Sequence, residues 1–139
     1  MPEDENMRIE LSKYRYKTAL ETYKNAKMSF ENGFFRDTIN RSYYTVFYAI
    51  KAILALGTID FKRHKDVIAY FNKEYVASEI FPRQMGRKLG RLKQIREEND
   101  YDDFVISSKE DAKAQLETAE EYLVLIEEYL TKEYMKLGE

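Results

Sequence analysis

The chain has 139 residues, of which 44% are hydrophobic and 35% are charged, so it fits one domain with enough apolar material for a core. It contains no cysteine and a single histidine, which excludes disulfides and thiolate metal sites and leaves little scope for a zinc or di-iron centre. We expect a cytoplasmic protein, because the net charge is −2, the first residues are acidic and no apolar run approaches the ~20 residues of a membrane span. We also expect no metal or cofactor.

Helices are predicted along most of the chain, because apolar residues recur every three or four positions and only 5 Gly and 2 Pro interrupt the pattern. Three predicted helices are long and two are short, and their ranges are 7–32, 34–56, 64–76, 83–98 and 109–136. A glycine ends each of the first two helices, and Ser108 with Asp111 forms a start similar to a capping box for the last one. Between the helices we expect loops over 58–63 and 99–107 and a break over 78–82, where a proline disfavours helix.

The second predicted helix is apolar over most of its circumference, which is typical of a helix at the centre of a bundle. No segment shows the alternating pattern of a strand, and the short connections favour antiparallel neighbours. The sequence therefore predicts an all-α fold, an antiparallel bundle of about five helices, as a single domain over residues 1–139.

That second helix also carries an arginine and three tyrosines within its apolar run. Arg41 and Tyr48 lie seven residues apart on one face, with Tyr44 between them, and Asp37 precedes Arg41 at the spacing of an ion pair. A guanidinium can bind a phosphate through two hydrogen bonds, and a phenol can donate to an oxyanion or accept a transferred group. The alternative is that the tyrosines are core aromatics whose hydroxyls lie at the rim.

Two further segments carry candidate residues. His64 stands at the predicted start of the third helix between two basic residues, whose charges favour the neutral imidazole. The stretch 83–96 is basic with no acidic residue inside it, and it ends at Arg96, which Asp100 and Tyr101 follow closely. The alternatives are a capping or surface histidine, a solvated basic face and a solvated helix end.

Three segments together resemble the HEPN domain family (higher eukaryotes and prokaryotes nucleotide-binding), in its small stand-alone prokaryotic form. Residues 40–48 are similar to the family's arginine-x-tyrosine-tyrosine helix, and residues 64–72 are similar to its histidine-lysine-glycine-like helix start. Residues 96–101 are similar to an arginine that is followed shortly by Asp-Tyr. The resemblance covers roughly residues 30–130, in this order and spacing over five helices.

The resemblance implies a symmetric homodimer whose second helices face each other across a cleft that binds RNA or a nucleotide. It also implies a toxin-like protein that has a minimal nucleotidyltransferase as partner. Many members of the family are metal-independent endoribonucleases in which a histidine moves a proton and an arginine stabilises the charge of the phosphorane. The resemblance therefore predicts a site centred on the arginine of the second helix.

This chain departs from the family at the histidine. Arg41 matches the motif arginine, but Tyr48 stands where the histidine is expected after six intervening residues, and shorter spacings reach only Val46 and Phe47. A tyrosine, with a reference pKa near ~10, is a poor base at neutral pH. Tyr48 also occupies the place of the tyrosine that serves as the modification acceptor in one variant of the motif.

Two hypotheses follow. The first is a HEPN-type toxin-like protein that binds RNA or a nucleotide, with Arg41 and Tyr48 as catalytic candidates and Tyr48 as the modification candidate. The second is a non-catalytic helical binding or dimerisation module. The candidates for substrate or nucleotide binding are Asp37, Tyr44, His64, Arg96, Asp100 and Tyr101.

Overall fold

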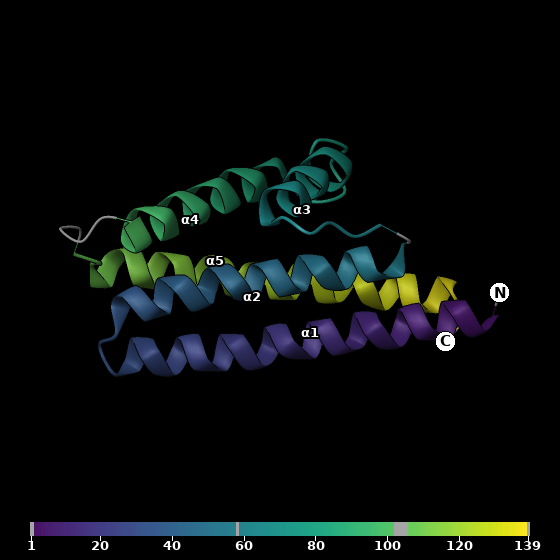
Figure 1. Cartoon of the computed structure of the whole chain (residues 1–139), viewed down its shortest axis with the longest axis horizontal. Coiled ribbons are helices and arrows are strands. Elements are labelled where there is room, and N and C mark those ends of the chain that lie inside the picture. Colours follow the sequence, from purple (N-terminus) through teal and green to yellow (C-terminus); the bar gives the residue numbers. More distant parts are fainter. Residues whose placement is uncertain (1, 58, 102–105, 139) are drawn as a thin grey trace.

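The computed structural model describes residues 2–57, 59–101 and 106–138. These residues form α1 (Pro2–Glu31), α2 (Phe35–Leu56), α3 (His64–Phe71), the π-helical turn η1 (Asn72–Val76), α4 (Arg83–Tyr101) and α5 (Lys109–Lys136), and they include no strand (Figure 1). The prediction of an all-α bundle with three long and two short helices is confirmed.

The helices form an antiparallel bundle. In Figure 1, α1 and α4 run in one direction and α2 and α5 run in the other, while both ends of the chain lie at the same end of the bundle. Helix α2 packs against each of α1, α3, α4 and α5, so it is the central helix, as its apolar composition predicts. Because α3 and α4 cover α2 on the side opposite α1, side chains from three helices meet along one face of α2.

Local sequence explains where several elements begin and end. Gly33 has φ +79°, a left-handed conformation that a glycine adopts without strain, and it ends the turn from α1 into α2. The Ser108 hydroxyl accepts a hydrogen bond of 2.9 Å from the Asp111 backbone N–H, which confirms the predicted cap of α5. The Tyr122 hydroxyl is fully buried and donates to the Met85 carbonyl at 2.6 Å, which ties α5 to α4.

Three predicted boundaries differ from the structure. Helix α1 begins at Pro2 instead of Met7, since a proline suits the first helical position, whose N–H has no helical partner. The third helix turns π-helical after Phe71, a change of hydrogen bonding that the apolar spacing does not reveal. The predicted loop over 99–107 is wrong at its start, because α4 continues to Tyr101 and buries Asn99 at 3% exposure. The rest of that loop lies largely outside the described residues.

No helix in the described part of the chain is long and apolar enough to cross a membrane.

Candidate functional site

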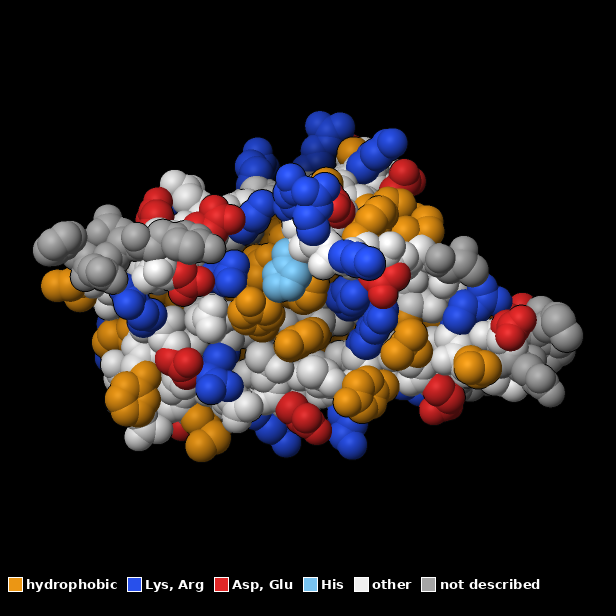
Figure 2. Space-filling model, viewed as in Figure 1, with side chains coloured by type: hydrophobic (Ala, Val, Ile, Leu, Met, Phe, Trp, Pro, Cys, Tyr) orange, Lys and Arg blue, Asp and Glu red, His pale blue; other side chains and the backbone are white. Residues whose placement is uncertain are grey.

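The candidate site lies where α3 and the last turns of α4 cover the arginine-bearing face of α2. Figure 2 views this face: the side chain of the only histidine lies among hydrophobic side chains, with Lys and Arg side chains grouped nearby. Arg41, Tyr44 and Tyr48 come from α2, His64 is the first residue of α3, and Arg96 lies in α4. The tertiary fold thus brings together residues that three separate segments supply.

Arg96 of α4 is held on this face by several contacts with α2. Its guanidinium lies 4.7 Å from the ring centroid of Tyr43 and 5.1 Å from that of Tyr44, so it stacks on two aromatic rings. Its Nη2 donates to the Tyr44 hydroxyl at 3.1 Å and its Nε donates to the Asn40 amide oxygen at 3.3 Å. Asp100 lies 3.5 Å from the same Nε. These contacts orient Arg96, and its Nη1 makes no hydrogen bond to any described residue.

His64 rests on the aromatic surface of α2. Its ring centroid lies 4.1 Å from that of Phe47 and 5.8 Å from that of Tyr44. Burial lowers the pKa of the imidazole below its ordinary value, and the positive charges of Arg96 and Lys51 lower it further. The direction matches the sequence prediction, but the charges responsible come from α4 and α2 instead of the flanking residues.

Arg41 lies one turn before Tyr44 on α2 and forms the predicted ion pair. Its Nε lies 2.6 Å from the Asp37 carboxylate, and the two side chains are 41% and 43% exposed. Partial burial raises the pKa of Asp37, but hydrogen bonds from Ser29 and Arg41 outweigh it, so the pKa lies below the usual value. The terminal nitrogens of Arg41 form no hydrogen bond with the described residues, so this exposed guanidinium retains two donor groups.

Tyr48 is partly buried at the edge of the same surface. Its ring centroid lies 6.0 Å from that of Tyr44 and 6.0 Å from that of Phe47. Its hydroxyl makes no hydrogen bond to another described residue. The backbone of Tyr101 ends α4, but its side chain lies outside the part of the structure that is described, so its predicted role in binding stays a prediction.

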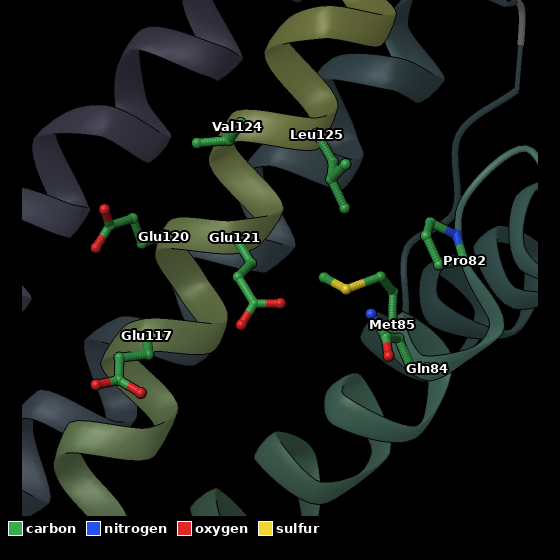
Figure 3. A pocket seen from close by; sticks show the side chains of 8 residues that line it. All are labelled: Pro82, Gln84, Met85, Glu117, Glu120, Glu121, Val124 and Leu125. Carbon is green, nitrogen blue, oxygen red and sulfur yellow. The ribbon is translucent and has the colours of Figure 1, made fainter.

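Two surface hollows differ in charge. One, of about 500 Å³, lies between the start of α2 and the end of α4 and is lined by Phe34, Phe35, Arg36, Asp37, Asn40 and Asp100. The other, of about 550 Å³, lies between α5 and the start of α4, and its lining includes Pro82 and Met85 together with Glu117, Glu120 and Glu121, of which Glu121 points toward Met85 (Figure 3). Since three carboxylates repel a phosphate, the second hollow is a poor site for a nucleotide. The first borders the Arg41 and Arg96 surface.

Several residues of this surface escaped the sequence prediction. From the sequence, Phe47 is only a position that cannot transfer a proton, but in the structure its ring contacts the imidazole of His64. Asn40 immediately precedes the motif arginine and accepts a hydrogen bond from Arg96, 56 residues away. No spacing rule within one helix could reveal that contact. Within the described residues, no group of three His, Cys, Asp or Glu side chains is arranged to hold a metal ion.

Comparison with known proteins agrees with this architecture. The chain is 29% identical over 125 residues to a Thermotoga maritima protein named "UPF0332 protein", an alignment that covers 90% of this chain and 95% of that one. It is 28% identical over 141 residues to "Putative toxin MJ0142" of Methanocaldococcus jannaschii, covering 96% of both chains. "Putative toxin MJ0605" of the same organism is 32% identical over 83 residues, which cover 60% of this chain and 62% of that protein.

The family model described as HEPN domain matches residues 12–129, from the first helix to the last. That range includes all three segments that carry the resemblance in the sequence, and the two full-length relatives align over nearly the whole chain. The chain therefore belongs to the HEPN domain family.

Proposed function

We propose that this chain is a toxin-like RNA-binding protein that cleaves RNA at the α2 face without a metal ion. The observation that carries the proposal is that Arg96 and an imidazole of lowered pKa share one aromatic surface of α2, with Arg41 one turn before Tyr44 on that helix. Among the described residues, Nη1 of Arg96 and the terminal nitrogens of Arg41 have no hydrogen-bond partner, and an arginine fork matches the geometry of a phosphate. The names of two relatives as putative toxins support the toxin-like part of the proposal.

RNA fits this surface better than a small acidic ligand does. Unpaired bases stack on aromatic rings and on guanidinium planes, and both are available beside Tyr44. The basic stretch 83–96 continues along α4 from Arg96, and Arg87 and Arg91 are exposed there. A backbone that follows α4 would therefore meet positive charge over several turns, and its binding would weaken with salt.

The partners in this proposal are a second copy of the chain and a minimal nucleotidyltransferase. Two α2 faces across a two-fold axis would place both copies of Arg41 and Arg96 along one cleft. A single monomeric species in light scattering at micromolar concentration would contradict the dimer.

Tyr48 is the modification acceptor in this proposal, since its hydroxyl has no partner among the described residues. Its phenolic oxygen would attack the α-phosphorus of ATP and lose its proton to solvent, with pyrophosphate as the leaving group. Intact mass after incubation with ATP and the nucleotidyltransferase tests this role. A mass without an added adenylyl group, or one added equally to Tyr48→Phe, would refute it.

A non-catalytic binding module is the second candidate function. Two observations favour phosphate binding without cleavage. Tyr48 stands in place of the motif histidine, and the Asp37 carboxylate already binds the Nε of Arg41. In this case the chain binds RNA with strong salt dependence and leaves it intact.

An RNA-cleavage assay with chelator separates the two functions. We expect the chain to cut tRNA or end-labelled single-stranded RNA in EDTA, and Arg41→Ala to lower the rate by about 10²–10³, the usual cost of removing a donor to a transition-state oxyanion. Arg8→Ala, which removes an arginine from the far end of α1, is the matched control. Equal cleavage by the wild type and Arg41→Ala would point to a contaminating nuclease, and intact RNA would favour the binding module.

A further inference from the structure

The α2 helix cannot itself provide the imidazole that RNA cleavage in this family uses. At the three spacings from Arg41 stand Val46, Phe47 and Tyr48, and none has a group suited to accept a proton at neutral pH. Val46 is fully buried and Phe47 is 7% exposed, so both also serve the core. The one carboxylate of α2 that the structure places beside Arg41, Asp37, is bound by Ser29 and Arg41, which lowers its pKa and makes it a weak base. We therefore look for the imidazole of this face in another element.

The structure places the chain's only imidazole beside one of the three motif positions on α2. The aromatic ring of Phe47 occupies one of the motif histidine positions, and the ring of His64 lies 4.1 Å away, over its face. Helix α3 delivers His64 there from outside α2, because His64 is its first residue and α3 packs on α2. From this geometry we infer that His64, instead of a residue of α2, moves the proton during RNA cleavage at this site. The inference rests on the proposed function.

The surroundings of His64 suit a base. Its imidazole forms no hydrogen bond or ion pair with the described residues, so none of these competes for its lone pair. The groups that face it are Tyr43, Tyr44 and Lys51 from α2 and Arg96 from α4. Burial and the two cations favour the neutral form, which can accept a proton near pH 7.

Arg96 provides the charge that complements this base. It stacks on Tyr44, whose ring also contacts His64, so the guanidinium and the imidazole flank one aromatic ring. A phosphate bound at Nη1 of Arg96, which makes no hydrogen bond to a described residue, would bring the neighbouring ribose toward the imidazole. The cation then stabilises the negative charge of the phosphorane as it develops.

The step balances without water or a metal as reactant. The neutral imidazole of His64 accepts the proton of the ribose 2′-hydroxyl, whose oxygen forms a bond to the adjacent phosphorus. The bond from phosphorus to the 5′-oxygen breaks, and that oxygen takes a proton from solvent while the imidazolium returns its proton to solvent. The products are a 2′,3′-cyclic phosphate and a free 5′-hydroxyl.

Cleavage by His64→Phe is the test, because phenylalanine keeps a ring on Phe47 and cannot transfer a proton. We expect the rate to fall by about 10²–10⁴, the usual contribution of general acid–base catalysis, with an unchanged circular dichroism spectrum. Tyr70→Phe, which alters an aromatic residue elsewhere on α3, should leave the rate unchanged. In His64→Ala, added imidazole should restore part of the cleavage, and a substrate with one 2′-deoxyribose should resist cutting at that position.

The outcomes separate the inference from the proposed function. If the wild type cuts RNA and Arg41→Ala does not, but His64→Phe cuts at the wild-type rate, the role of His64 is overturned and the proposed function stands. The role of His64 is also overturned if Tyr48→Phe loses cleavage while His64→Phe keeps the wild-type rate. If the wild type leaves every RNA intact, the proposed cleavage fails and the inference fails with it.

Discussion

Replacing Arg96 with alanine tests how much this side chain contributes to the free energy of unfolding by attaching the end of α4 to α2. The substitution removes a guanidinium that is 19% exposed and bridges two helices. It removes the stacking on Tyr43 and Tyr44 together with the hydrogen bonds to Tyr44 and Asn40. It also breaks the ion pair with Asp100 along α4.

The magnitude follows from these contacts. Stacking of a cation on aromatic rings contributes about 0.5–2 kcal/mol, and each hydrogen bond contributes about 0.5–1.5 kcal/mol net. The ion pair at 3.5 Å contributes at most about 1 kcal/mol, because surface pairs are screened by water. Since the same side chain makes all of these contacts, their losses overlap, and we expect Arg96→Ala to lower the free energy of unfolding by about 2–4 kcal/mol.

Urea denaturation followed by circular dichroism at 222 nm, a wavelength characteristic of helix, measures this loss. For a chain of this size, a loss of about 2–4 kcal/mol corresponds to a fall in Tm of about 6–15 °C. Arg91→Ala is the matched control, because Arg91 is an exposed arginine of the same helix, and we expect a change within about 0.5 kcal/mol. Arg96→Lys keeps the charge but loses the flat fork, so it should recover less than half of the loss. A loss below about 0.5 kcal/mol in Arg96→Ala would refute the reasoning.

The remaining predictions concern His64 and the glycines Gly90 and Gly33. Burial and the charges of Arg96 and Lys51 lower the pKa of His64 in the folded chain, so the unfolded chain binds a proton more readily. The contribution of His64 to the free energy of unfolding should therefore be complete above pH 6.5 and should decrease as the pH falls from 6.5 toward the pKa of the folded chain. In NMR titrations of the single histidine, Arg96→Ala should raise that pKa, and an unchanged pKa would contradict the assigned cause. Gly90→Ala should raise the free energy of unfolding by about 0.5–1 kcal/mol, since Gly90 lies within α4 and an added Cβ meets no atom within 4 Å. Gly33→Ala should lower the free energy of unfolding by about 1 kcal/mol, because a φ of +79° strains an alanine. Thermal melts of the two glycine variants measure both changes. A stabilised Gly33→Ala would contradict the role of the turn.

Residue spacing along the sequence predicts the contacts of the site within one helix but not those between helices. The pair of Asp37 and Arg41 lies within one helix, so a rule for residues four apart predicts it, and the structure confirms it. The contact of Arg96 with Tyr44 spans 52 residues and depends on how α4 crosses α2. A pattern along one helix holds no information on that crossing, which side-chain packing decides.

The sequence by itself determined the helical class and the central place of α2. Apolar residues at helical spacing cannot bury one face in any other secondary structure, and a helix that is apolar over most of its circumference must be surrounded. It also determined the turn at Gly33, because that backbone conformation favours glycine.

Only the tertiary structure decided what surrounds the incomplete motif. The sequence shows an arginine without its histidine, and it places His64 and Arg96 in other helices with no indication of distance. Packing of α3 and α4 on α2 sets the imidazole over Phe47 and the guanidinium over Tyr44. The physical reason is that burying the apolar faces of α3 and α4 fixes their positions, and the polar residues at the ends of those faces meet as a consequence.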